Sequence, residues 1–177
     1  MSNDELRKGI LELVRILDKG IAMEHGAHIY YSMAAQRSPA AEGKKMFQWL
    51  ADFELNHEDK LRHKRQELLE HPEMKGVSHP PLDEEYTLSE GGESIELPPE
   101  PSETDVLKLA ILNEKKAYAF YQRKLTHAAD DSLRTMFETF AKEEEKHIKI
   151  LSELRQRLMI EGLWGDVDAF EDDLKPG

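Results

Sequence analysis

Cysteine is absent from this chain of 177 residues. That absence excludes disulfides, zinc–thiolate sites, thiol-attached haem and rubredoxin-type iron, so any bound metal must be held by Glu, Asp or His. Long apolar runs are also missing, because no stretch approaches the roughly 18 apolar residues that a membrane-spanning helix needs. The opening sequence MSNDELRKGI lacks the apolar region of a signal peptide. We therefore expect a cytoplasmic protein with no membrane partner.

Positive charge is also in short supply. The chain carries 36 acidic and 24 basic residues, which gives a formal net charge of −12. A surface of this sign repels nucleic acid and anionic lipid, so we expect neither as a partner. With 39% hydrophobic and 34% charged residues, the composition is typical of a globular protein. The length suits a single domain over residues 1–177 with a substantial core.

Four long segments carry the apolar periodicity of helices, at about residues 4–37, 39–70, 103–127 and 131–160. Their starts have recognisable signals. Ser2 and Glu5 form a capping box before the first segment. Ser38 with Pro39 predicts the start of the second, and Ser102 that of the third. The predicted fold class is therefore all-α.

Two further segments break this periodicity. Residues 71–102 hold six of the eight prolines and eight acidic residues, so they predict a non-helical crossover between two helix pairs. Extended, such a segment reaches roughly 100 Å, enough to run the length of a helical bundle. Residues 161–177 form an acidic tail with Trp164 and Phe170, and the pattern gives that tail no position.

The first and second helix pairs are copies of each other. Shifting the chain by 90 residues aligns residues 24–68 with 114–158 without a gap and gives twelve identities. In an antiparallel hairpin with arms of equal length, residues equally far from the turn lie level with each other. The sequence therefore predicts an antiparallel four-helix bundle, built from two repeated hairpins that are joined by a long crossover.

Six of the repeated polar residues fall on the apolar stripes, where a core is expected. Each copy has a lone Glu and a later Glu-x-x-His, whose members share one helix face. Four buried carboxylates are very costly unless neutralised, and two divalent ions would supply that charge. Carboxylate with imidazole suits iron or manganese. Without metal we expect some of these carboxyl groups to take up protons, with raised pKa values. The candidate metal ligands are Glu24, Glu54, His57, Glu114, Glu144 and His147.

This pattern resembles that of the ferritin-like di-iron carboxylate superfamily, and within it the chain is most similar to rubrerythrin-type proteins. The resemblance covers roughly residues 5–160. It implies that Glu54 and Glu144 bridge two metals. It further implies that Glu24 and His57 hold one metal terminally, and Glu114 and His147 the other. Tyrosines seven residues after each lone Glu, Tyr31 and Tyr121, match those that hydrogen-bond ligand carboxylates in that family.

Two features depart from the family pattern. Ala117 stands where rubrerythrins usually carry an additional Glu, which puts the iron movement linked to that ligand in doubt. A rubredoxin domain is missing, because there is no cysteine. His28 lies one turn after Glu24, and we expect it to support the ligands or to pack rather than to bind metal. We expect His25 and His63 to face solvent.

The resemblance implies a non-haem di-iron redox protein with two iron ions per chain, although manganese or a mixed pair also fits the ligands. We expect an oxidoreductase, a rubrerythrin-like peroxidase of oxidative stress, that reduces hydrogen peroxide or dioxygen with electrons from an external donor protein. The alternatives are a ferroxidase or iron-storage protein, a di-manganese catalase, and a scaffold with a vestigial site. We expect a homo-oligomer, most simply a dimer.

Overall fold

The computed structural model describes residues 2–79, 101–128 and 131–174. No strand occurs in these ranges, which confirms the all-α fold class. None of the described helices is both long and apolar enough to cross a membrane. The central part of the predicted crossover, residues 80–100, lies outside the described residues. The elements are α1 (Asn3–Arg37), α2 (Ala41–Leu69), η1 (Pro72–Met74), α4 (Glu103–Lys124), η2 (Leu125–His127), α5 (Asp131–Glu161), η3 (Val167–Phe170) and α6 (Glu171–Leu174).

The chain divides into two compact units, and α1 and α2 contribute to both. The first unit comprises Met1–Gly26 and Leu55–Ser94. It has a small apolar core of Ile10, Val14 and Met74, with partly buried leucines packed around it. A nearly buried ion pair joins its two helices, because Arg65 Nε donates to Asp18 Oδ1 over 2.5 Å.

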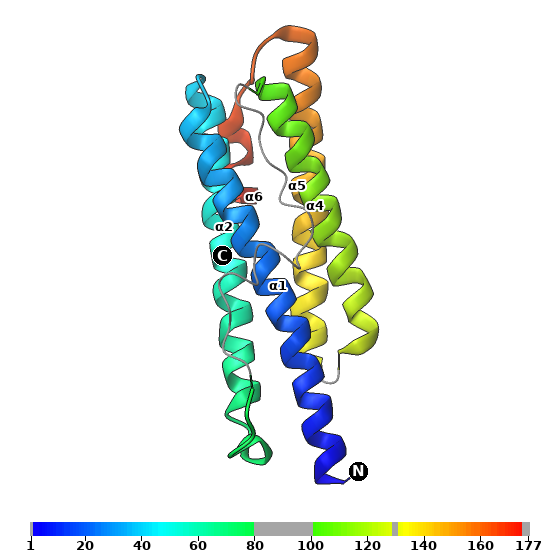
Figure 1. Cartoon of the computed structure of the whole chain (residues 1–177). Helices are drawn as coiled ribbons and strands as arrows, with labels where there is room; N and C mark the ends of the chain where they lie inside the picture. Colours follow the sequence, from blue (N-terminus) through cyan, green and yellow to red (C-terminus); the bar gives the residue numbers. More distant parts are fainter. Residues whose placement is uncertain (1, 80–100, 129–130, 175–177) are drawn as a thin grey trace. The chain divides into compact units, whose positions relative to one another are not determined.

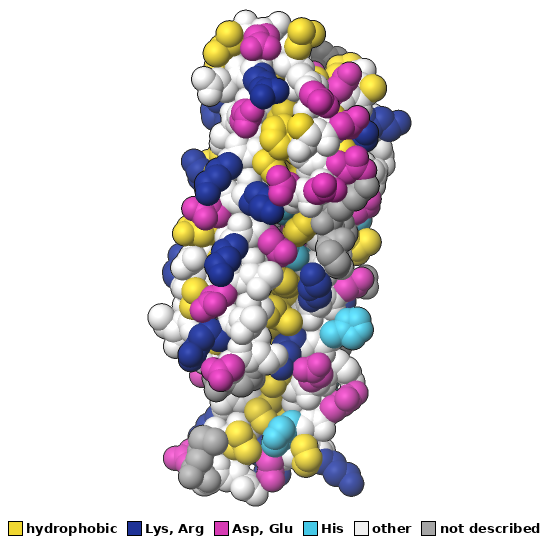
Figure 2. Space-filling view, turned by 180° about the vertical axis from the view of Figure 1, so that it is seen from behind, with side chains coloured by type: hydrophobic (Ala, Val, Ile, Leu, Met, Phe, Trp, Pro, Cys, Tyr) yellow, Lys and Arg dark blue, Asp and Glu magenta, His cyan; other side chains and the backbone are white. Residues whose placement is uncertain are grey.

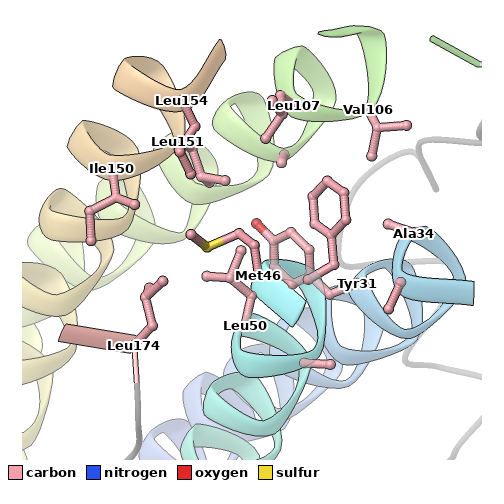
Figure 3. Close-up of a cluster of buried hydrophobic side chains, with 14 of the residues drawn as sticks. Tyr31, Ala34, Met46, Leu50, Val106, Leu107, Ile150, Leu151, Leu154 and Leu174 are labelled. Carbon is pink, nitrogen blue, oxygen red and sulfur yellow. The ribbon is translucent and has the colours of Figure 1, made fainter. Parts of the chain in front are cut away.

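The second unit, Ala27–Glu54 and Ile95–Gly177, is a bundle whose described residues include segments of the long helices α1, α2, α4 and α5, together with η2, η3 and α6. Figure 1 shows α4 and α5 running side by side within it. Figure 3 shows side chains from α1, α2, α4, α5 and the tail converging on one core. Its buried members are Tyr30, Tyr31, Ala34, Ala35, Met46, Phe47, Leu50, Ala51, Val106, Leu107, Ala110, Ile150, Leu151, Leu154, Trp164, Val167 and Leu174.

Local capping signals explain where α1 and α4 begin. Ser2 and Glu5 exchange backbone-to-side-chain hydrogen bonds, which is the predicted capping box. Ser102 accepts a hydrogen bond from the backbone N–H of Asp105. The prediction for α2 was wrong, because this helix begins at Ala41 and Ser38 does not cap it. The Ser38 hydroxyl instead donates to Glu103 Oε1 on α4 over 2.7 Å, a tertiary contact that competes with the local cap.

The acidic tail folds back onto the second unit. Gly162 has a φ of 69° and its N–H donates to the Leu158 carbonyl, so a left-handed glycine ends α5 and reverses the chain. The tail then buries three apolar side chains: Trp164 is 4%, Val167 3% and Leu174 0% exposed. Ion pairs from Lys45 to Asp168 and from Lys146 to Asp173 hold it at the surface.

Charged side chains cover much of the face shown in Figure 2. Acidic and basic groups are interspersed there, and apolar side chains are scattered between them. Among the described residues, the large apolar side chains exposed by more than half are Met159, Ile160 and Leu163, which lie around the end of α5.

The packing of the tail against Gly43 predicts the effect of a substitution at that glycine. A Cβ on Gly43 would lie 2.5 Å from Trp164 and closer still to Ser38 Oγ. We expect Gly43→Ala to destabilise the protein by about 1–3 kcal/mol, the usual cost of overpacking, because Trp164 must move. Urea denaturation measures the loss, and Trp164 emission in a Trp49→Phe background should shift to longer wavelength.

Gly9→Ala on α1 is the matched control, since the Cβ that alanine adds there would meet no packing neighbour within 4 Å. Alanine is a better helix former than glycine, so this change should stabilise by about 0.5–1 kcal/mol. Unchanged stability and unchanged Trp164 emission in Gly43→Ala would contradict the described packing of the tail.

Candidate metal centre

Six acidic and imidazole side chains on the four long helices lie in apolar surroundings. None of them is more than 2% exposed. Helix spacing explains why they share faces, since Glu54 and His57 on α2, like Glu144 and His147 on α5, are three residues apart. Glu24 and Glu114 occupy matching positions on α1 and α4. The predicted site residues are therefore buried as the apolar stripes require.

Four of the six converge within the second unit. Glu54, Glu114, Glu144 and His147 each offer one ligand atom, and these four atoms all lie within 4.8 Å of one another. The centre of this cluster is His147 Nδ1. It lies 3.1 Å from Glu114 Oε2, 3.5 Å from Glu144 Oε2 and 3.7 Å from Glu54 Oε1. Three helices therefore direct carboxylate oxygens at one imidazole nitrogen.

The ring of His147 is oriented by an aromatic neighbour. Phe53 meets it edge to face, with ring centroids 4.6 Å apart and an interplanar angle of 87°. The other ring nitrogen, Nε2, is buried, and no hydrogen-bond partner for it lies among the described residues. Nδ1 therefore makes the polar contacts of this ring and is its candidate donor atom. Phe53 was not identified from the sequence, because an apolar residue beside a ligand carries no distinguishing pattern.

The remaining two candidate ligands lie in the first unit. Glu24 Oε1 is 3.8 Å from His57 Nδ1, and both side chains are buried. This pair repeats the Glu114–His147 pair of the second unit, with the same 33-residue separation along the chain. The terminal pairs implied by the family resemblance are thus neighbours within each unit.

Hydrogen bonds converge on the Glu114 carboxyl group. Burial opposes its ionisation, but hydrogen bonds with Glu144, His147 and Tyr31 outweigh burial and lower the pKa of Glu114 to about 2. Glu114 is thus an exception to the expected rise in carboxyl pKa.

Tyr31 supports this anion. Its hydroxyl donates to Glu114 Oε1. Burial, followed by the charge of Glu114 and Glu54, raises the pKa of Tyr31 well above 10. The phenol therefore stays protonated at neutral pH and acts as a hydrogen-bond donor to the carboxylate.

Tyr121 and His28 were predicted to support the ligands. Tyr121 is fully buried and packs against Phe137 and Phe140. His28 Nδ1 lies 2.7 Å from the carbonyl oxygen of Ala51, to which it can only donate. Its hydrogen bond therefore ties α1 to α2, which is the packing role expected for it.

A second polar cluster lies in the first unit and was missed. Glu58 is only 4% exposed. One of its oxygens is 3.0 Å from His25 Nδ1, and the other accepts from Arg62 Nε over 2.7 Å. The expectation that His25 faces solvent was right only in part, because 34% of its side chain is exposed while Glu58 holds its Nδ1. A signal existed, since Glu58 continues the buried α2 spacing of Ala51 and Glu54 by one turn. His63, as expected, is exposed.

The residues present fit a metal site. Three carboxylates and one imidazole, all nearly inaccessible to water, form a hard, anionic donor set without sulfur, which suits iron or manganese. Buried carboxylates at these separations repel one another unless protons or cations neutralise them. The cluster is therefore compatible with a di-metal site.

A bundle of long helices with buried Glu-x-x-His motifs defines the class of ferritin-like carboxylate metalloproteins. The rubrerythrin family model matches residues 15–155. The chain belongs to the rubrerythrin family, which confirms the resemblance read from the motifs. A search of curated proteins found no significant match. Family membership supports a di-iron protein with a redox or iron-handling role.

The lowered pKa of Glu114 predicts how the metal-free protein responds to acid. Ionised Glu114 is favoured in the folded state, so it stabilises the fold above the unfolded pKa of 4.5 and loses that effect as the pH falls towards about 2. We expect the stability advantage of the parent over Glu114→Gln to shrink below about pH 4.5. Urea denaturation of metal-free samples across this range measures it.

Glu138→Gln on α5 is the control, because Glu138 is exposed. Its difference from the parent should stay nearly constant over the same range. A constant difference for Glu114→Gln as well would contradict the lowered pKa.

Proposed function

We propose that this protein is a di-iron oxidoreductase that reduces hydrogen peroxide, or dioxygen, with electrons from an external donor protein. The observation that carries the proposal is the buried cluster of Glu54, Glu114, Glu144 and His147 in a chain of the rubrerythrin family. Two iron ions per chain would be held by these four residues together with Glu24 and His57. When bound, the iron pair supplies the electrons that convert peroxide and two protons to two water molecules.

The chain's own residues would keep the ligand atoms in the ionisation states and surroundings that bind cations. Glu114 remains anionic because its hydrogen bonds favour the ionised form. Tyr31 remains a neutral phenol, so it donates to Glu114 and does not compete as a ligand. Phe53 and the surrounding apolar residues exclude water from the imidazole face of His147. His147 Nδ1, which faces the three carboxylates, would be the imidazole donor to a bound metal.

The amino-acid composition indicates where the electrons for this reaction would come from. These 177 residues contain no cysteine and so no rubredoxin-type iron, which means that reducing equivalents come from outside them in this proposal. The net charge of −12 favours a basic donor. A homodimer in the cytoplasm is the simplest assembly for such an enzyme.

An iron-handling role is the second candidate. Ala117, where relatives of this type usually carry a further Glu, is buried on α4 and offers no ligand atom. A donor set with fewer carboxylates releases iron more readily, which favours a ferroxidase that oxidises ferrous iron and passes it on. Oxidant preference and iron retention separate this role from a peroxidase.

Metal stoichiometry tests the site. We expect two transition-metal ions per chain, roughly 3.5–4 Å apart as in other two-metal sites. Glu54→Gln and His147→Ala should each lose at least half of the bound metal, because each removes a donor from the buried cluster. Metal analysis of protein loaded with ferrous or manganous ion measures the loss, and extended X-ray absorption fine structure measures the metal–metal distance.

His63→Ala is the control, since His63 is exposed and bonds only the backbone oxygen of its own helix among the described contacts. It should bind metal like the parent. Full occupancy in Glu54→Gln and His147→Ala, or a single ion per chain in the loaded parent, would contradict the site.

Oxidant preference tests the activity. We expect the diferrous protein to be oxidised at least tenfold faster by hydrogen peroxide than by dioxygen, and turnover to require an added rubredoxin-like protein and its reductase. Stopped-flow absorbance with each oxidant gives the rates, and size-exclusion chromatography with iron analysis gives the assembly.

The alternatives predict different results. A large shell that retains hundreds of irons per particle would make the protein an iron store. Faster oxidation by dioxygen than by peroxide, with release of ferric iron, would assign it as a ferroxidase. His147→Ala serves as the negative control in both measurements.

A further inference from the structure

An aromatic series leads from the carboxylate cluster to the tail. Trp164 meets Phe47 edge to face, with ring centroids 5.6 Å apart and an interplanar angle of 89°. Phe47 stacks on Tyr31, with centroids 6.3 Å apart and planes only 15° from parallel. The Tyr31 hydroxyl donates a hydrogen bond to Glu114 Oε1. The series lies wholly in the second unit, and Figure 3 shows Tyr31 within the core that surrounds it.

The two ends of this series are the side chains that lose single electrons most readily, a tyrosine and a tryptophan. Oxidation of a phenol requires an acceptor for its proton, and Tyr31 has the Glu114 carboxylate for this purpose. Tyr30 also touches Tyr31, with centroids 5.4 Å apart, but its hydroxyl donates to the Val106 carbonyl, a far weaker proton acceptor. Because of its proton acceptor, Tyr31 rather than Tyr30 is the tyrosine expected to be oxidised.

The tryptophan end belongs to one repeat only. Tyr121 and Phe137 reproduce the Tyr31–Phe47 contact, with centroids 5.8 Å apart. The residue 90 positions before Trp164 is Met74, so the repeat supplies no second tryptophan at that position. The series from Tyr31 to Trp164 is thus an addition to the duplicated bundle, made by the tail.

Trp164 lies close enough to the surface to accept electrons from small molecules in solvent. It is 4% exposed, and its chain neighbour Leu163 is 65% exposed, so the indole lies directly beneath the surface. Gly43 lets it approach α2 closely, since any side chain there would collide with the ring. The indole Nε1 is buried and finds no hydrogen-bond partner among the described residues, so an oxidised Trp164 has no nearby group to take its proton.

We propose that Tyr31, Phe47 and Trp164 form a route by which electrons pass singly from Trp164 to the metal centre when peroxide has oxidised it and no donor protein is present. This inference rests on the proposed function. Tyr31 gives one electron to the centre and its proton to Glu114. Trp164 then gives one electron, across the ring of Phe47, to the tyrosyl radical, which regains the proton from Glu114.

The fate of Trp164 completes the electron balance. A small reductant such as ascorbate can return one electron to the indole radical cation. Without a reductant, a second electron passes by the same route to the centre, and addition of one water molecule to Trp164, with release of two protons, gives hydroxytryptophan. Each pair of electrons delivered to the centre matches one molecule of peroxide reduced to water.

The chain contains two tryptophans, and this makes the test direct. Trp49 is partly buried, packs under Lys45 and is more accessible than Trp164, so a diffusing oxidant would attack Trp49 first. The full chain is loaded with ferrous iron without oxygen, treated with a small excess of hydrogen peroxide and digested. Mass spectrometry then quantifies oxygen addition at each tryptophan.

We expect Trp164 to be modified several-fold more than Trp49 in the loaded protein, and not in the metal-free protein given the same peroxide. Ascorbate should suppress the modification. Tyr31→Phe should reduce it several-fold, whereas Tyr30→Phe, the adjacent buried tyrosine, should leave it unchanged. In freeze-quenched samples, electron paramagnetic resonance should show a tryptophan radical that Trp164→Phe abolishes, with a longer-lived tyrosyl signal in its place.

Other outcomes overturn the route. Equal modification of both tryptophans, or undiminished modification of Trp164 in Tyr31→Phe, would show attack by free oxidant and contradict it. Iron content and the absorbance change on oxidation are measured on the same samples. If iron binds and is oxidised while Trp164 remains intact, the route is wrong and the proposed function stands. If no iron binds, or peroxide does not oxidise it, both are wrong.

Discussion

The burial of carboxylates in an apolar bundle is the constraint on which the rest of this structure depends. Glu54, Glu114 and Glu144 are at most 2% exposed, and all three direct an oxygen at the same nitrogen of His147. Such an arrangement is unfavourable unless protons, hydrogen bonds or cations compensate the charge. Tyr31 provides part of that compensation, and the donor set as a whole suits metal ions.

Much of this was predictable from sequence, because the site is built from local helical spacing and from a repeat. Glu-x-x-His places two donors on one face regardless of the rest of the fold. The 90-residue repeat then gives both copies the same spacing between the lone Glu and the motif. Capping pairs such as Ser2–Glu5 fixed a helix start for the same reason, since both partners lie within one turn of chain. Features determined within a few residues are readable from the sequence.

Features that depend on distant residues were not readable. Ser38 looked like a helix cap and instead bonds Glu103, which lies 65 residues away. His25 looked solvent-facing and is held by Glu58, which lies 33 residues away. The tail gave no periodic signal at all, because its burial depends on separate contacts of Trp164, Val167 and Leu174 with a core already formed by the helices. Sequence patterns report which face of a helix is apolar, but they do not report which partner a polar side chain will choose.

The two repeats have kept their donor residues and changed what surrounds them. Phe53 packs on His147, whereas its counterpart in the second copy is Glu143. Glu58 and His25 pair in the first unit, where the second copy has Ile148 and Lys115. Equal ligands in unequal surroundings differ in local polarity and in hydrogen bonding, and these tune the affinity and potential of a bound metal. A duplicated hairpin therefore need not give two equivalent metal positions. In this chain aromatic side chains pack around Glu114 and His147. The first unit, which holds Glu24 and His57, has instead the polar cluster of Glu58 and His25.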